Sequence, residues 1–203
     1  MAKDLSPKLL LMVTLVISDA YKPLLIMTKR EVITLAYSPS RNHSKAGIRA
    51  RDLVLLILRW TGRIVMGVTR LQKIAFLLQQ EVGLGKDISF EPYYYGPFSR
   101  EIADALRYLE REGMVNIVDR PSGKIIVLTD VGRSEAERLE EDVEPGLRDI
   151  ARIKAAFYAR VPLTYLLAYV YTRYPDYAIF SEIGDKVQRW ARIYRLRVME
   201  GRA

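Results

Sequence analysis

The chain of 203 residues contains no cysteine and a single histidine, His43. Without cysteine there is no disulfide, no cysteine-ligated iron–sulfur cluster and no thiolate zinc site. A Ser-His-Asp triad would have to use His43, and nothing around that residue prepares such chemistry. A zinc site made of one histidine and carboxylates would be unusual. We therefore expect no metal and no cofactor.

Other catalytic signatures are also missing. The Gly62–Gly67 stretch lacks the Gly-Lys-Ser/Thr ending of a P-loop, and there is no Gly-x-Ser-x-Gly nucleophile elbow. Glu140, Glu141, Asp142 and Glu144 offer carboxylates for acid–base work, but a solvated acidic run explains them better. The sequence predicts a binding protein rather than an enzyme.

Charge is unevenly distributed along the chain, whose formal net charge is +8. Residues 41–76 contain eight basic residues and one acidic residue, whereas residues 130–149 contain three basic and eight acidic residues. Residues 150–203 are basic again, with ten basic and four acidic residues. Basic blocks favour a polyanion or an acidic protein as partner, and the alternative is a generally solubilising surface. We expect the acidic run to point away from any nucleic acid.

Residues 1–50 form an N-terminal extension that several interpretations fit. Leu9–Ile17 is apolar and follows Lys3 and Lys8, as in an exported leader. A buried helix or strand, or a true start at Met27, explains it better, and the stretch is too short for a bilayer span, which needs about 20 apolar residues. Residues 32–37 are expected to form a strand, and residues 38–47 resemble a linker in composition.

The stretch from Phe90 to Val115 contains one well-delimited helix. Ser99 is a good N-cap, and Gly113 ends the helix. Apolar residues recur at helical spacing on one face, which predicts a core-facing stripe: Ile102, Ala105, Leu106 and Leu109. The opposite face carries Arg100, Asp104, Arg107, Tyr108 and Arg111. That face is either a solvated surface or a surface that contacts a partner.

A hairpin and another helix are expected after this helix. Residues 115–118 and 124–128 are β-rich and flank a turn cluster, and Thr129 precedes a polar helix. Helix, hairpin, helix is the order of a winged helix-turn-helix, in which the capped helix reads the major groove. Arg120 and Lys124 would lie on the wing. The predicted fold class is thus mainly α with a small β-hairpin, and residues 51–144 form the winged-helix domain.

Two apolar helices are expected before that stretch. Asp52 should cap the first, over residues 53–60, and Thr69 the second, over residues 70–82. The stripe expected to be buried in the second is Leu71, Ile74, Leu78 and Val82, with Arg70, Lys73 and Gln80 outside.

Residues 145–203 are expected to form a C-terminal helical extension. Residues 147–158 and 163–171 predict helices, with Pro162 at the start of the second. Ser181 should cap the last helix. Its apolar stripe either packs on the domain or forms a homodimer interface: Ile183, Val187, Trp190, Tyr194 and Val198.

The aromatic turn before the capped helix has two possible roles. Its residues are Tyr93, Tyr94, Tyr95, Gly96, Pro97 and Phe98. Exposed tyrosines stack on bases, whereas buried ones pin a loop, and the second role is the commoner. Gly96 suits a positive φ, and Pro97 fixes the approach to the helix.

Two stretches taken together resemble a known family. Residues 69–77, Thr-Arg-Leu-Gln-Lys-Ile-Ala-Phe-Leu, and the Tyr-Gly-Pro-Phe-Ser run at 95–99 are similar to the Panacea domain, also called SocA-like, and to related archaeal and bacterial proteins. The resemblance covers about residues 51–128 and implies a compact helical binding domain, with toxin neutralisation among its uses. Separately, Leu128-Thr129-x-x-Gly132 resembles the segment after the wing in PadR and MarR regulators.

Taken together, these patterns predict a cytoplasmic, dimeric DNA-binding regulator. Arg100, Arg107, Tyr108 and Arg111 would enter the major groove of double-stranded DNA. Arg120 and Lys124 on the wing, with Arg70 and Lys73, would contact phosphates. The alternative is an antitoxin-type module that binds a toxin-like protein through the turn at 93–98 and the helix after it.

Overall fold

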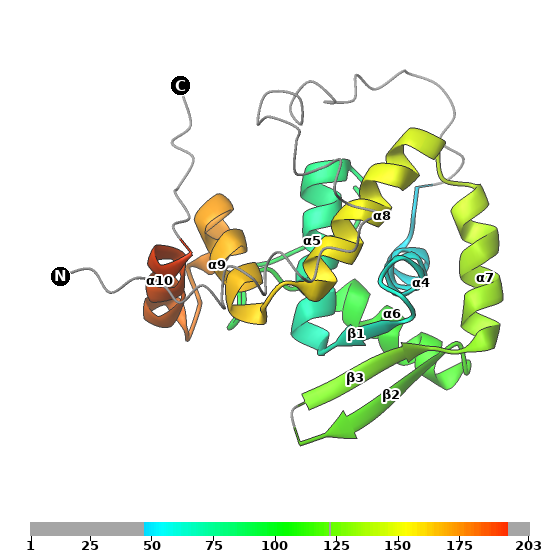
Figure 1. The fold of residues 1–203 in the computed structure, drawn as a ribbon, viewed down its shortest axis with the longest axis horizontal. Coiled ribbons are helices and arrows are strands. Elements are labelled where there is room, and N and C mark those ends of the chain that lie inside the picture. The colour runs from blue at the N-terminus through cyan, green and yellow to red at the C-terminus, as the bar shows by residue number, and fades with distance from the viewer. Residues whose placement is uncertain (1–46, 122, 195–203) are drawn as a thin grey trace, which may run out of the picture. The chain divides into compact units, whose positions relative to one another are not determined.

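Helix α4, Ala50–Trp60, lies at the centre of the fold in the computed structural model, which describes residues 47–121 and 123–194 (Figure 1). Residues 53–58 of α4 are at most 1% exposed. Helices α5, α6, α7 and α8 all pack against α4, so it has no solvated face. The expected strand at 32–37, the linker at 38–47 but for its last residue, and the chain end at 195–203 fall outside the described residues.

Seven α-helices and a small antiparallel sheet make up the described part of the chain, so the protein is mainly helical there. After α4 come β1 Ile64–Met66, α5 Val68–Val82, α6 Arg100–Arg111, β2 Val115–Arg120, β3 Gly123–Leu128, α7 Asp130–Glu141, α8 Pro145–Arg160, α9 Leu163–Arg173, the short 3₁₀ helix η2 Pro175–Ala178 and α10 Gly184–Ile193.

The first two helices begin earlier than their polar residues predict. Asp52 is the third residue of α4, and its carboxylate accepts a 3.4 Å bond from the Arg49 amide instead of capping as the N-cap. Helix α5 begins at Val68 after Gly67, whose φ of 93° sets the turn, so Thr69 is inside the helix. The start of α5 therefore depends on the Gly67 turn, whereas at the start of α4 the Asp52 carboxylate bonds back to the amide of the extended Arg49.

The sheet has three strands in the order β1-β3-β2, one more than the predicted hairpin. Ile64 pairs with Val127 and Met66 with Ile125, while Val118 pairs with Ile125 from the other side. Val65, Ile126 and Leu128 face the helices and are fully buried. Strand β1 escaped sequence reasoning because three residues are too short for a recognisable alternation.

Thr129 and Gly132 join the hairpin to α7. The Thr129 hydroxyl donates to the Met114 carbonyl over 2.9 Å and accepts from the Gly132 amide over 3.1 Å, which caps α7. A Cβ on Gly132 would lie 2.1 Å from the Met114 carbonyl oxygen, so only glycine permits this approach. The Leu-Thr-x-x-Gly pattern therefore has a direct packing reason here.

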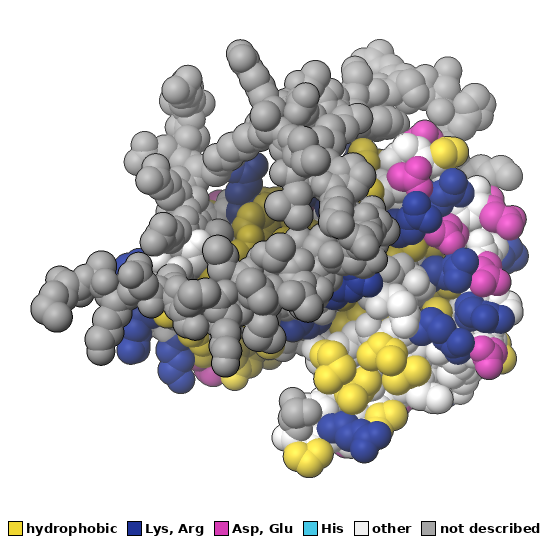
Figure 2. Space-filling model, viewed as in Figure 1, with side chains coloured by type: hydrophobic (Ala, Val, Ile, Leu, Met, Phe, Trp, Pro, Cys, Tyr) yellow, Lys and Arg dark blue, Asp and Glu magenta, His cyan; other side chains and the backbone are white. Residues whose placement is uncertain are grey.

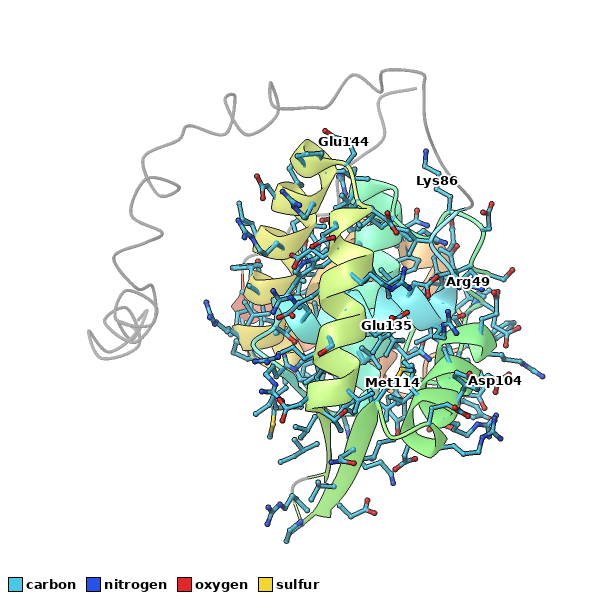
Figure 3. All side chains as sticks on the ribbon, turned by 90° about the vertical axis from the view of Figure 1, so that its right-hand side faces the viewer. Arg49, Lys86, Asp104, Met114, Glu135 and Glu144 are labelled. Carbon is cyan, nitrogen blue, oxygen red and sulfur yellow. The ribbon has the colours of Figure 1, made fainter. Side chains whose placement is uncertain are left out.

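Helix α7 lies in front of α4 in Figure 3, where Glu135 is labelled on it. Glu140 links the two helices, because it accepts bonds of 2.6 Å from Trp60 Nε1 and 3.0 Å from Arg59 Nε. Arg138 pairs with Glu135 within the helix, whereas Glu137 also pairs with Arg59 and Asp130 with Arg63. Glu141, Asp142 and Glu144 are exposed, as expected of a solvated acidic run, but Glu140 is not: it links α7 to α4.

Helices α8 and α9 contribute to the same core as α4 and α5, through Ala151, Ala155, Leu166 and Val170. The apolar stripe of α10 packs on α9, where Val187 meets Leu167 and Ala168. Of the two roles the sequence left open for that stripe, the described part of it takes the packing role. No helix of the described residues is long and apolar enough to cross a membrane.

Glu81 joins three helices through one carboxylate. It accepts bonds of 2.7 Å from Lys154 Nζ, 2.7 Å from the Tyr158 hydroxyl and 2.8 Å from the Tyr169 hydroxyl. Burial raises the pKa of both tyrosines, and the nearby Glu81 charge raises it further. These phenols therefore stay protonated donors, which keeps α5, α8 and α9 together.

We expect Glu81→Gln to lower the free energy of unfolding by about 1–3 kcal/mol, because the charged acceptor of three bonds is lost. Urea unfolding followed by circular dichroism measures the change. Glu110→Gln, on the exposed face of α6, is the matched control and should be neutral. Equal stabilities for the two variants would show that Glu81 does not hold the helices together.

Candidate functional site

Helix α6 carries the side chains that the sequence assigned to a recognition surface. The Ser99 hydroxyl caps it by accepting from the Ile102 amide over 3.3 Å, as predicted. Ile102, Ala105, Leu106 and Leu109 are buried, which confirms the core stripe. On the opposite face the side chains of Arg100, Arg107 and Arg111 are 80%, 78% and 75% exposed.

Each of these three arginines has an acidic neighbour. Arg100 Nε lies 3.2 Å from a Glu91 carboxylate oxygen, and Arg107 pairs with Asp104 one turn before it. Arg111 lies 4.0 Å from Glu112 and places its guanidinium 5.6 Å from the centre of the Tyr108 ring. Exposed ion pairs contribute about 0–1 kcal/mol each, so a partner can displace them at small cost.

The surface formed by α6 and the hairpin is electrically balanced. Residues 100–124 contain five basic and five acidic residues. At the hairpin tip, Lys124 Nζ lies 3.1 Å from Asp119, its cross-strand partner, and Arg120 is exposed at the end of β2. Figure 3 shows α6, with Asp104 labelled on it, at the same end as the hairpin. Recognition here would depend on individual hydrogen bonds more than on a positive field.

The solvent-facing side of the sheet is apolar. Ile64, Met66 and Val118 are 46%, 49% and 37% exposed. The register places the partly buried Ile125 between Met66 and Val118, which makes one continuous row across three strands. Figure 2 shows hydrophobic side chains gathered over the sheet, with Lys and Arg side chains beside them. The sequence did not predict this surface, because it did not predict strand β1.

Arg70 was predicted to contact phosphates, and the structure corrects this. Its side chain is buried, and Nη1 donates to the carbonyls of Tyr158 at 2.9 Å and Val161 at 2.7 Å. These carbonyls lie at the C-terminal end of α8, where a cation is favourable. Burial lowers the pKa of Arg70. The guanidinium holds α8 on α5 and is not available to a partner.

Lys73 was also predicted to lie outside, and it is 2% exposed. Its Nζ donates to the Pro97 carbonyl over 2.8 Å. The neighbouring Gln72 clamps Ser99 from both sides, since it donates to the carbonyl and accepts from the amide, each over 2.9 Å. Arg70, Gln72 and Lys73 point inward because α5 is covered on all sides, and the unbroken apolar run at 74–78 was the signal for that.

The aromatic turn is pinned to its surroundings, but its tyrosines are not buried. Tyr93 stacks on Phe98 with ring centres 4.9 Å apart, and Glu91 and Phe98 form an antiparallel bridge, so the turn is pinned. Yet Tyr93, Tyr94 and Tyr95 remain 41%, 48% and 46% exposed. The turn is an ordered aromatic surface that leads directly into α6.

Gly96 is the position in this turn that no other residue type fits. Its φ is +81°, and a Cβ there would lie 2.6 Å from Cε1 of Tyr171 on α9. The Tyr171 hydroxyl in turn bonds the Ser181 hydroxyl over 2.7 Å. The Tyr-Gly-Pro sequence therefore lets Tyr171 of α9 lie against the turn.

Nothing in the described residues forms a cluster of three or more His, Cys, Asp or Glu side chains able to hold a metal ion. The buried polar side chains of α5 are those of Arg70, Gln72 and Lys73. They form hydrogen bonds with backbone groups and not with one another. The geometry at α6 thus offers exposed hydrogen-bonding groups and aromatic surface.

We expect Gly96→Ala to destabilise the protein more than Gly113→Ala. Both glycines have a positive φ, which costs an L-residue about 1–2 kcal/mol, but only Gly96 would also contact a neighbouring ring. Urea unfolding of the two variants separates the backbone strain from the contact. Equal losses would mean that Tyr171 does not constrain the turn.

No family model matches the chain, and no curated protein or solved structure matches it either. The resemblance to the Panacea domain and to PadR and MarR regulators accordingly stays a prediction from the sequence.

Proposed function

We propose that the chain is a DNA-binding protein of winged-helix type, acting as a transcriptional regulator. The observation that carries the proposal is the order of elements together with the strand pairing. Helix α4, strand β1, helices α5 and α6 and strands β2 and β3 follow one another, and β1 pairs with β3. A winged helix has this order, with α6 as the recognition helix and β2–β3 as the wing.

The exposed face of α6 supports the same proposal. Arginine forks donate two hydrogen bonds to guanine edges, and the extended side chains of Arg100, Arg107 and Arg111 are directed to solvent. Binding DNA would displace the acidic neighbours of these arginines, and this costs little because exposed ion pairs are weak. Arg120 and Lys124 at the hairpin tip are suited to phosphate contacts. Arg70 and Lys73 take no part, because they are buried.

We expect Arg107→Ala to weaken binding to a selected duplex by about 1–3 kcal/mol and to relax its sequence preference at one position. Arg152→Ala is the matched control, since Arg152 also pairs with an acidic residue three positions before it, Asp149 on α8, and both side chains are more than half exposed. Selection from random duplexes followed by fluorescence anisotropy across a salt series gives both quantities.

Lys124→Ala should lower the affinity equally for all duplex sequences and reduce the salt slope by about 1.

Failure to select any duplex, or equal affinities for the Arg107 and Arg152 variants, would contradict the recognition role of α6.

Paired half-sites also require a dimer. Ile153 and Phe157, one turn apart on α8, are exposed apolar residues available to such an interface. Sedimentation velocity tests whether a homodimer forms.

A second candidate is an antitoxin-type module that binds a protein. The apolar outer face of the sheet and the balanced charge of residues 100–124 favour it, because protein interfaces have apolar centres and few net charges. The aromatic turn at 93–98 adds rings of the kind that anchor such interfaces.

For that candidate, we expect Met66→Glu to weaken binding to a co-expressed toxin-like protein by about 1–4 kcal/mol. The unbound protein should tolerate glutamate at this position, because Met66 is about half exposed. Val131→Glu, at an exposed apolar residue on α7, is the control. Unchanged neutralisation by the Met66 variant would remove the sheet face from the interface.

A further inference from the structure

Lys73 is a buried amine at the entry to α6. Its residue is 2% exposed, and its Nζ donates to the Pro97 carbonyl over 2.8 Å, two residues before Ser99, the cap of α6. This is the one hydrogen bond of the amine in the part of the chain that the structure describes. A protonated amine has three donors, so two of them are left without an acceptor in this position.

No carboxylate offsets the charge of Lys73 within the described residues. The one acidic side chain of α5, that of Glu81, lies eight residues further along the helix and is bonded to Lys154 and to two tyrosines. Acidic side chains of the neighbouring elements have partners of their own: Asp52 of α4 pairs with Arg49, Asp149 of α8 with Arg152, and Glu91 before the turn with Arg100.

The titratable groups that surround Lys73 are phenols and one further cation. Tyr93 and Tyr95 of the turn line the same small cavity as Lys73, and Tyr171 reaches that turn from α9. Phenols as a class are uncharged near neutral pH. Arg70, one helical turn before Lys73, is bound to carbonyls of α8. None of these groups favours the charged form of the amine.

Burial without a counter-charge makes the proton of Lys73 easy to lose. An unpaired ammonium is costly to remove from water, so the group either gives up its proton or returns to water. Burial lowers the pKa of Lys73 from 10.5 to about 7. Near neutral pH the buried amine therefore exists in both forms, whereas a lysine in water stays protonated up to about pH 10.

We propose that Lys73 is a proton-operated switch at the entry to α6. In the closed form its amine holds the Pro97 carbonyl. Uptake of a proton favours an open form, in which the flexible lysine side chain turns its ammonium to water and the Pro97 carbonyl loses its donor. Because Gln72, next to Lys73, holds both backbone groups of Ser99, the opening extends to the cap of α6. The inference concerns the fold itself and does not depend on what α6 binds.

The direction of the pH dependence follows from the number of protons in each form. Between about pH 7 and pH 10 the open form carries one more proton than the closed form, so each fall of one pH unit favours opening by up to about tenfold. Below that range both forms are protonated, and above it both are neutral, so the populations no longer change. The closed turn therefore gains stability as the pH rises from about 7. Burial raises the pKa of Tyr171, so this phenol stays neutral through the range.

Hydrogen exchange of the full chain between about pH 7 and pH 9 tests the switch. Two amides report on the turn, that of Phe98, which donates to the Glu91 carbonyl, and that of Ser99, which donates to Gln72 Oε1, each over 2.9 Å. After correction for the intrinsic exchange rate, we expect their protection to rise by up to about tenfold per pH unit. The amide of Arg133 on α7, which is remote from α5 in sequence, is the reference and should keep its protection.

Two variants assign the effect to one lysine. Lys73→Met removes the titrating amine and should make the protection of Phe98 and Ser99 independent of pH. Lys86→Met, at an exposed lysine beyond the end of α5, should leave the pH dependence unchanged. Constant protection in the unaltered chain would overturn the proposal, as would a pH dependence that persists in Lys73→Met. An equal change at Arg133 would also overturn it, because it indicates unfolding of the whole protein and not a local opening.

Because Lys73→Met also loses the bond to Pro97, the unaltered chain provides a second measurement. NMR titration of the lysine side-chain amines should show one amine that titrates near neutral pH, well below the others. If every lysine titrates above about pH 9, the amine of Lys73 is not held in the closed form described here, and the proposal is wrong.

Discussion

The clamp between Gln72 and Ser99 is the contact on which the functional surface depends. One side-chain amide satisfies both backbone groups of Ser99, and Lys73 holds the carbonyl of Pro97 just before it. Ser99 is also the cap of α6, so the same three residues determine where α6 begins and how it leaves the core. Buried polar groups are costly unless each is paired, which makes this arrangement difficult to shift in small steps.

The surface beyond the clamp combines features that no single partner class explains. The element order around α6 is the basis of the proposed winged helix, whereas the charges of residues 100–124 are balanced and the outer face of the adjoining sheet is apolar. The excess positive charge of the chain comes from other segments, such as residues 150–203. If DNA is the partner, affinity depends on a few directional contacts, because electrostatic attraction at α6 is weak. If a protein is the partner, the apolar row on the sheet contributes most of the binding energy.

Local rules predicted those elements whose ends are defined by neighbours in sequence. Helix α6 has a capping serine, an apolar stripe and a terminal glycine within fifteen residues, and the structure agrees at each point. The hairpin was predicted for the same reason, whereas Thr129 was expected only to precede a polar helix and its role as the cap of α7 comes from the structure. The starts of α4 and α5 were not, because α4 begins after the extended Arg49 and α5 after the positive-φ Gly67, and neither residue caps its helix with a side-chain hydrogen bond. Residues 64–66 form strand β1 because they pair with β3, which follows α5, α6 and β2 in the chain.

The sequence by itself determined which side of α6 is polar, because helical spacing and capping act over a few neighbouring residues. It also determined that thiol chemistry is excluded, since the chain contains no cysteine. Only the tertiary structure decided the fate of Arg70 and Lys73. Helical periodicity places them outside a stripe, but α8, α9 and the turn at 93–98 cover that side of α5. Whether a polar side chain faces water or core depends on segments distant in sequence, and on backbone carbonyls that no residue pattern encodes.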